Sequence, residues 1–294
     1  MAVNLLPKGK LTGRECKPIN PSKRAEVYYA SSVKHLISLL KFVVKQEITR
    51  ENQQKNLGDA SPDSIQKRFQ TFNRIVDRFL TIDISAFATR VARNFAKITN
   101  ADNKKRLSRE FESVMAINPE AVLDTKQTQD FFKGMIGENV QLIKGLHTES
   151  LSNVQKIGQS MIGGNKTLRE AGKEITAALN IQQNRGMRIA IDQSRKAMGD
   201  LTNLRMQKLG IKLYRWSAVM DKRKNGGTRP SHAAMNNRIC RFDDPSVYFN
   251  EKTKQWEKRK RIGGVELHPS QDFNCRCVSK VILQSIEGLN DERQ

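Results

Sequence analysis

Five residues in the last quarter of the chain carry side chains that bind metal ions. Thiolate and imidazole are the donors that zinc prefers, and four of them close a structural site. The residues are His232, Cys240, His268, Cys275 and Cys277. Their spacing is irregular, but Cys275 and Cys277 would point to the same side of a regular strand. Two interpretations stay open: a structural zinc site, or small buried cysteines and a packed histidine in a protein core.

The same residue types could form a Cys–His nucleophilic pair, which needs an activating base and an orienting third group. No oxyanion loop and no carboxylates at useful spacing accompany them. The pairs Gly226-Gly227 and Gly263-Gly264 are too short for a phosphate-binding loop. We therefore predict a protein that is not an enzyme, with no catalytic residue and no cofactor apart from the zinc of the first interpretation.

A run of cations between residues 252 and 261 surrounds a tryptophan, and only Glu251 and Glu257 oppose it. Such a hairpin could lie on a phosphate backbone without reading bases. The alternative is a solvated surface loop. The predicted DNA-contacting residues are Lys252, Lys254, Trp256, Lys258, Arg259, Lys260 and Arg261. The whole chain has 52 Lys and Arg against 30 Asp and Glu, a formal charge of +22. This charge favours a polyanionic partner, nucleic acid first and an acidic protein surface second.

Apolar residues before Ile211 recur at helical spacing, which predicts a long helical region. We expect these helices to support the segment that holds the candidate residues. Serine or threonine caps predict helix starts at Ser22, Ser61 and Thr167. We expect breaks at a charged turn over 100–109, at Asn118-Pro119, after Lys144-Gly145, near residue 180 and at Gly210. The predicted helices span 22–50, 61–98, 109–118, 127–145, 150–162, 168–179 and 182–209.

From Ile211 the apolar residues alternate, with Tyr214 and Trp216 on one face and Leu213 on the other, which indicates a strand. Further short strands are predicted at 239–242, 247–249, 254–257, 264–267 and 278–283. The fold class is therefore mainly α, an extended helical body with a small C-terminal α+β domain. The expected divisions are a basic disordered arm (1–21), a long-helix region (22–125), a second helical region (126–210), the α+β domain (211–284) and a polar tail (285–294).

Composition also bounds the compartment and the shape of the protein. Hydrophobic residues make up 37% of the chain, which is low for one thick core. No signal peptide is visible in residues 1–20. The most apolar run, Leu36–Val44, is interrupted by Lys41 and is too short to span a bilayer. Four unevenly placed cysteines do not form a disulfide framework. We expect a soluble protein made in a reducing cytosol.

An ordered set of residues in this region resembles the Mu-F-like family of phage head morphogenesis proteins, also called minor head or minor capsid proteins. The motif residues are Trp216, Asp221, Arg229, His232, Cys275 and Cys277. The likeness covers roughly Gln127–Leu283, so that region 126–210 corresponds to the helical part of the family's domain. An insertion at Lys224–Thr228 and the pair Asn236-Asn237 depart from the family's pattern.

The resemblance implies a role in the virion. Relatives associate with the portal vertex in the capsid interior and are linked to head assembly and genome delivery. The implied partners are the portal protein, double-stranded DNA bound without sequence preference, and a scaffold or major capsid protein, with no membrane in the assembled head. The protein would be made in the bacterial host cytoplasm. The alternative is a general nucleic-acid-binding protein with a zinc-stabilised C-terminal domain.

Overall fold

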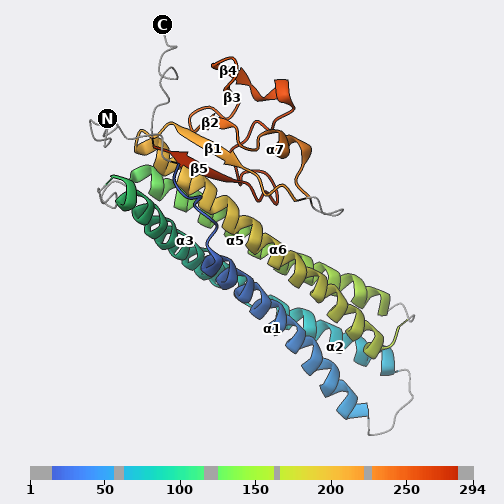
Figure 1. Ribbon diagram of the computed structural model, residues 1–294. Helices are drawn as coiled ribbons and strands as arrows, with labels where there is room; N and C mark the ends of the chain where they lie inside the picture. Colours follow the sequence, from blue (N-terminus) through green and yellow to red (C-terminus); the bar gives the residue numbers. More distant parts are fainter. Residues whose placement is uncertain (1–14, 56–62, 116–124, 162–165, 222–226, 284–294) are drawn as a thin grey trace. The chain divides into compact units, whose positions relative to one another are not determined.

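The computed structural model describes residues 15–55, 63–115, 125–161, 166–221 and 227–283 (Figure 1). They form two compact units. The sheet unit comprises Met1–Ala25, Ala96–Gly134 and Asp192–Gln294, and the helical unit comprises Glu26–Phe95 and Met135–Ile191. The long helices are α1 (Lys23–Lys55), α2 (Asp63–Leu80), α3 (Ile84–Met115), α5 (Lys126–Ser160) and α6 (Leu168–Lys208). A mainly α protein with a small C-terminal α+β region is thus confirmed.

The helical unit is held together by the apolar face of α1. Its buried residues follow the predicted helical spacing: Tyr29, Val33, Leu36, Ile37, Leu40 and Val44. The Tyr29 ring meets Phe95 of α3 edge-on, with centroids 5.3 Å apart. Helix α6 approaches α1 closely at Gly186, where an added Cβ would lie 2.3 Å from Cγ1 of Val33. None of the described helices is both long and apolar enough to cross a bilayer.

Several predicted helix breaks are wrong, because a buried apolar face continues through each of them. Residues 100–109 lie within α3, where Leu107 and Phe111 are buried. Helix α5 passes through Gly145, since Ile143, Leu146 and Val154 continue one buried face. Helix α6 likewise passes through residue 180 without a break. In contrast, a short interruption at residues 81–83, which was not predicted, separates α2 from α3.

Two of the three predicted caps are present. The Ser22 hydroxyl accepts the Ala25 N–H at 3.0 Å. Thr167 and Glu170 form a reciprocal capping box at the start of α6, with N–H···O distances of 2.8 and 3.2 Å. Gly210 ends the α6 region with φ of +72°, as a C-terminal glycine should. The predicted start at Ser61-Pro62, the end at Asn118-Pro119, residues 1–14 of the arm and the tail 285–294 lie outside the described residues.

The sheet is antiparallel and has the strand order β4-β3-β2-β1-β5. Its strands are β1 (Leu213–Ser217), β2 (Ile239–Arg241), β3 (Val247–Asn250), β4 (Gln255–Lys258) and β5 (Val278–Ile282). The strand predicted at 264–267 does not form. Instead, the carbonyl groups of Val265 and Leu267 accept hydrogen bonds from the Arg259 guanidinium, at 3.2 and 2.8 Å. These carbonyls are therefore turned toward a side chain and not toward a strand.

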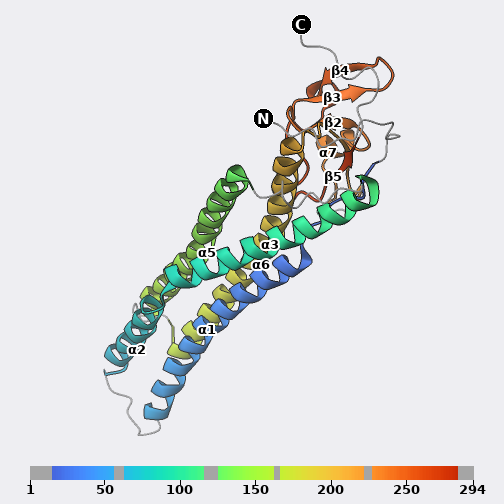
Figure 2. The same ribbon diagram turned by 90° about the vertical axis from the view of Figure 1, so that its left-hand side faces the viewer.

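The predicted alternation along β1 is reproduced in the burial of its two faces. Tyr214 and Trp216 belong to a core that includes Leu107 and Phe111 of α3 and Met198 and Met206 of α6. Figure 2 shows the C-terminal part of α6 beside the sheet. Leu213 belongs to a second cluster, with Ile239, Phe249, Ile282 and the partly buried Trp256.

Residues 15–21 of the predicted disordered arm are ordered within the sheet unit. The Cys16 N–H donates to the Val281 carbonyl at 2.8 Å, and Glu15 pairs with Ile282 of β5. Cys16 and Ile19 are buried in the core of the sheet unit. The arm was predicted from its charge and its Pro and Gly content, and that composition does not reveal these two apolar anchors.

Candidate metal centre and basic hairpin

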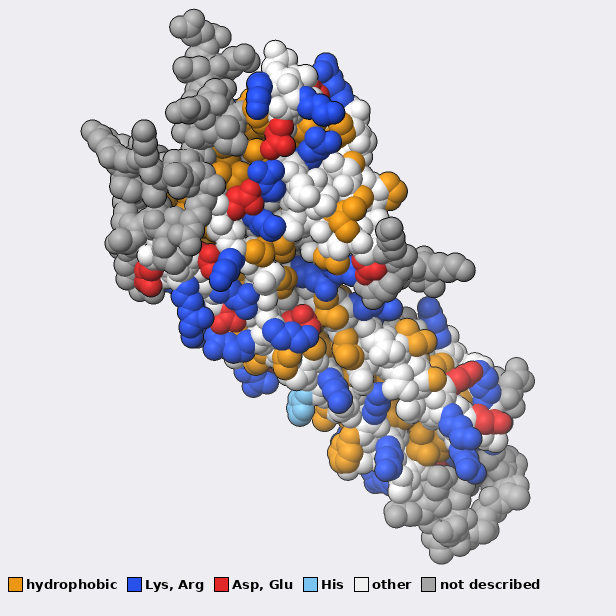
Figure 3. Space-filling view, in the orientation of Figure 1, with side chains coloured by type: hydrophobic (Ala, Val, Ile, Leu, Met, Phe, Trp, Pro, Cys, Tyr) orange, Lys and Arg blue, Asp and Glu red, His pale blue; other side chains and the backbone are white. Residues whose placement is uncertain are grey.

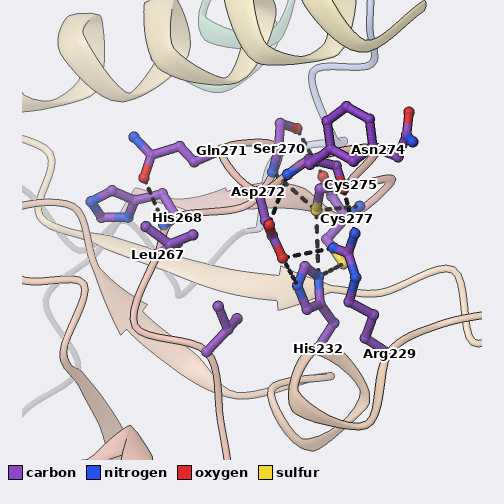
Figure 4. Close-up of polar contacts among 12 residues, drawn as sticks. Arg229, His232, Leu267, His268, Ser270, Gln271, Asp272, Asn274, Cys275 and Cys277 are labelled. Carbon is purple, nitrogen blue, oxygen red and sulfur yellow. Dashed lines mark hydrogen bonds and ion pairs between the residues drawn. The ribbon is translucent and has the colours of Figure 1, made fainter. Parts of the chain in front are cut away.

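Three of the five predicted metal ligands meet in the sheet unit. His232 lies on the short helix α7 (Pro230–Ala234), and Cys275 and Cys277 lie just before β5. The His232 Nδ1 is 3.5 Å from the Cys275 Sγ and 3.4 Å from the Cys277 Sγ (Figure 4). Each residue is only 3% exposed. Among the described residues they form a group whose ligand atoms all lie within 4.8 Å of one another.

Local turns bring the two sulfur atoms to the imidazole. Pro230 occupies the first turn of α7, where a missing N–H costs nothing. Asn274 has φ of +54°, and the Cys275 N–H donates to the Asp272 carbonyl at 3.0 Å, so the chain turns sharply before the cysteines. Both sulfurs face the same ring, as their spacing predicted, although they precede the strand and are not part of it.

The outer nitrogen of His232 is held by a carboxylate. Its Nε2 lies 2.9 Å from the Asp272 Oδ2, which also accepts from Nη1 of Arg229 at 2.6 Å. The second guanidinium nitrogen of Arg229 donates to the Phe273 carbonyl at 2.5 Å. Because the Asp272 carboxylate can only accept a hydrogen bond, Nε2 carries the hydrogen and Nδ1 faces the sulfur atoms.

The charges of the cluster are interdependent. The hydrogen bond from Cys277 and the contact with His232 lower the pKa of the Cys275 thiol. The Cys275 sulfur and burial raise the pKa of Cys277. The contact with Cys275, followed by Asp272, raises the pKa of His232. The contacts within the cluster therefore favour the thiolate form at Cys275 and the thiol form at Cys277.

The remaining motif residues surround this cluster. The Trp216 ring, fully buried on β1, meets the His232 ring edge-on with centroids 5.9 Å apart. Asp221 accepts from Arg276 at 2.9 Å, which ties the residue between the cysteines to the end of the segment after β1. Asp221 and Thr228 also bond to each other, through an N–H···O contact of 2.8 Å between backbones, and so close the inserted loop. Six residues chosen from sequence order thus gather at one place in the fold.

Cys240 and His268 do not join the three ligands. Nδ1 of His268 lies 3.0 Å from the hydroxyl of Tyr214, and a side-chain hydrogen bond joins Cys240 to the same tyrosine. Burial raises the pKa of Cys240 to about 11, so it remains a thiol. Burial and then the charge of Arg259 lower the pKa of His268 to about 4, against the weaker opposing effect of Asp243 and Asp244. Both residues are therefore neutral members of the core.

Arg259 is placed differently from the prediction, which assigned it to DNA. It is fully buried at 0% exposure, in the 3-10 helix η2 (Arg259–Ile262). Its guanidinium donates to the Val247 carbonyl at 2.9 Å and to the Tyr214 hydroxyl at 3.0 Å, in addition to the two loop carbonyls. It also lies over the Trp216 ring, 5.6 Å from the centroid. Nothing in the run 258–261 distinguishes this arginine from its exposed neighbours, so sequence reasoning missed its role.

The other cations of the hairpin are exposed. They are Lys252, Lys254, Lys258, Lys260 and Arg261. Figure 3 shows Lys and Arg side chains gathered where Figure 1 labels β3 and β4. The Lys258 ammonium donates a hydrogen bond to the Ser246 hydroxyl at 3.0 Å, and Lys260 forms an ion pair with Glu266 at 3.4 Å. Trp256 is half-buried, with its ring against Phe249 and under the Arg241 guanidinium. The tryptophan therefore packs the hairpin onto the sheet.

Together, the helices, the antiparallel sheet and the buried His–Cys–Cys cluster define a helical protein with a small, internally clasped α+β region. Residues 154–280 match a family model described as Phage Mu protein F like protein. This stretch contains every motif residue and the basic hairpin, and it is similar to the Mu-F-like family of phage head morphogenesis proteins. The resemblance read from the sequence is confirmed there.

A curated relative extends the similarity along the chain. An uncharacterized protein of Haemophilus influenzae is 27% identical over 294 residues, which covers 97% of this chain and 59% of that protein. The chain therefore spans less than two thirds of the relative's length. No solved structure matches the chain.

Proposed function

We propose that this protein is a non-enzymatic minor head protein of a bacteriophage, which lies at the portal vertex in the capsid interior and contacts packaged DNA. The observation that carries the proposal is the family match over 154–280, because it covers the sheet and its cluster. The proposed partners are the portal protein, double-stranded DNA, and a scaffold or major capsid protein. The proposed role is in head assembly and genome delivery.

The charge of the chain supports contact with DNA. A formal charge of +22 opposes close packing of protein copies, and packaged phosphates would offset it. The proposed contact set is smaller than the sequence indicated, since Arg259 is buried and Trp256 packs on the sheet. Lys252 and Lys254 form no ion pair among the described residues, so their charges are available to phosphate at little cost.

A charge-reversal experiment tests the DNA contact. The variant Lys252→Glu/Lys254→Glu/Lys258→Glu alters only exposed residues of the hairpin. Removing three phosphate contacts should weaken binding to a DNA fragment and reduce the slope of log K against log salt by up to about 3. The matched control carries the same charge change on exposed lysines of the helical unit: Lys45→Glu/Lys156→Glu/Lys173→Glu. Equal loss in both variants would show a net-charge effect and no specific contact by the hairpin.

The portal contact needs a separate test. Co-expression with the portal protein of the same phage should give a complex of fixed stoichiometry that survives size-exclusion chromatography in salt high enough to screen surface charge. Binding to DNA with no portal complex would instead favour the alternative, a general nucleic-acid-binding protein. Image reconstruction of the portal vertex would then place the chain inside or outside the capsid shell.

A further inference from the structure

We infer that His232, Cys275 and Cys277 bind one Zn²⁺ ion, with a water molecule as the fourth ligand. The ion would clasp α7 to the segment that leads into β5. This inference rests on the geometry of the sheet unit and is independent of any portal or DNA contact.

The separations between the three side chains fit a tetrahedral ion. With Zn–N near 2.0–2.1 Å and Zn–S near 2.3 Å, nitrogen and sulfur ligands lie roughly 3.5–3.6 Å apart. The His232 Nδ1 is 3.5 and 3.4 Å from the two sulfur atoms. An ion could therefore enter with only small movements of the side chains. Two thiolates and an imidazole in a buried site favour zinc over magnesium or calcium, which take oxygen ligands.

The surroundings also resemble those of metal-bound histidine and cysteine. A ligating histidine usually donates its other N–H to a carboxylate, which fixes the ring, and Asp272 lies 2.9 Å from the His232 Nε2. Arg229 in turn fixes Asp272 through a 2.6 Å ion pair. The Cys275 sulfur accepts backbone N–H groups of Ser270 and Cys277, both at 3.4 Å, which stabilise a thiolate.

Hydrogen bonding alone satisfies these three groups less well. The His232 Nδ1 offers either one lone pair or one proton, and two sulfur atoms lie at almost the same distance from it. A zinc ion bonds to all three ligands at once.

The other predicted donors are engaged elsewhere, which leaves the fourth position to solvent. Cys240 and His268 lie with Tyr214 in the separate group described above. Both carboxylate oxygens of Asp272 are used: Oδ2 contacts His232 and Arg229, and Oδ1 accepts the Phe273 N–H at 2.8 Å. Three protein ligands and one water give zinc four bonds.

Metal content of the full-length protein tests the inference directly. Protein expressed in zinc-supplemented medium and purified without chelator should contain about one zinc per chain. Replacement by Co²⁺ should give the intense visible bands of a four-coordinate ion and a thiolate-to-cobalt charge-transfer band in the near ultraviolet. Zinc well below stoichiometry, with no such bands on Co²⁺ addition, would overturn the inference whatever the behaviour of any variant.

Variants locate the site. Cys275→Ser and Cys277→Ser should each remove most of the bound metal, whereas Cys240→Ser and Cys16→Ser, at buried cysteines outside the cluster, should keep it. His232→Cys should keep the metal and strengthen the charge-transfer band. Asp272→Asn should weaken Zn²⁺ affinity by about 10–100-fold, since it loses the outer carboxylate. Equal metal loss in Cys240→Ser would contradict the assignment.

Counting the free thiols distinguishes cysteines that can bind a metal ion from cysteines joined in a disulfide. The chain has four cysteines, and all four are free thiols in the structure. Denatured, chelator-treated protein should therefore titrate as four thiols. Two thiols in metal-free protein would mean a Cys275–Cys277 disulfide and would also overturn the inference.

Discussion

The loop that carries the cysteines lies directly on α6, and Gly199 is the residue that allows it. A Cβ added at Gly199 would lie 2.7 Å from the Ser270 Cβ and 3.0 Å from the Pro269 carbonyl oxygen. Both atoms are backbone or fixed to it, and Ser270 already has φ of +73°, so the loop cannot yield by a simple rotamer change. We predict that Gly199→Ala destabilises the sheet unit.

The magnitude follows from two opposing effects. Alanine is favoured over glycine within a helix by about 1 kcal/mol. Overpacking of a fitted contact costs about 1–3 kcal/mol. The net expected change is a loss of about 1–2 kcal/mol, toward the upper end of this balance, because the crowding involves a backbone oxygen and a Cβ that cannot rotate away. Gly134→Ala is the matched control: it lies in α5 within the same unit and has no atom within 4 Å of the added Cβ, so it should stabilise by about 0.5–1 kcal/mol.

Tryptophan fluorescence during urea unfolding measures this change, because both tryptophans, Trp216 and Trp256, belong to the sheet unit. Gly199→Ala should shift the midpoint to lower urea with an unchanged slope. If Gly199→Ala proves as stable as the parent while Gly134→Ala stabilises as expected, the loop does not rest on α6 in the way described.

Three further predictions concern single groups. Lowering the pH from 7 to 4 should destabilise the sheet unit by about 3 kcal/mol through His268 alone. The pKa of His268 is about 4 in the folded protein, below its value of about 6.5 in the unfolded chain. The contribution of neutral His268 to stability is therefore complete above pH 6.5 and is lost as the pH falls toward 4. His268→Gln should remove this part of the acid sensitivity, seen as a smaller difference between urea midpoints at the two pH values. Arg259→Lys should lower the free energy of unfolding by about 2–4 kcal/mol in the same assay, because buried carbonyls lose their donors. Arg261→Lys, at an exposed neighbour, should change it by less than about 0.5 kcal/mol. Equal effects of the two variants would contradict the buried network. Thr167→Ala should cost about 1 kcal/mol and lower the thermal midpoint followed by circular dichroism, and no change would mean that the capping box does not form in solution.

Periodicity and caps in the sequence predict elements well but predict their ends poorly. The stripe along α1 and the alternation along β1 are local patterns, and both are reproduced in the structure. The false breaks at 100–109 and at Gly145 arose because charge and glycine were read as stop signals. A helix continues through such residues when its buried face does, and that face is defined by partners distant in sequence.

The candidate site shows the same division. The Cys-x-Cys spacing correctly predicted that Cys275 and Cys277 face one point, and His232 was among the five donors named. Selecting among five donors was not possible, since Cys240 and His268 are distinguished only by the turns that direct them toward Tyr214. Asp272 and Arg229, which orient the histidine, were visible only as ordinary charged residues, or as a motif position without a role.

The burial of the cluster favours a structural role over a reactive one. A reactive thiolate must meet its substrate, but Cys275 and Cys277 are each 3% exposed, and Trp216 covers the His232 ring. Contacts around them join segments that are distant in sequence: His232 and Cys275 are 43 residues apart, and Asp192 of α6 and Asn274 are 82 residues apart. Such contacts constrain the fold most where the hydrogen bonds of the sheet are absent. The helix α7 and the loop before β5 lie outside the sheet, so they depend on these contacts. The cluster therefore joins the irregular segments of the sheet unit, and the exposed cations of β4 and η2 take no part in it.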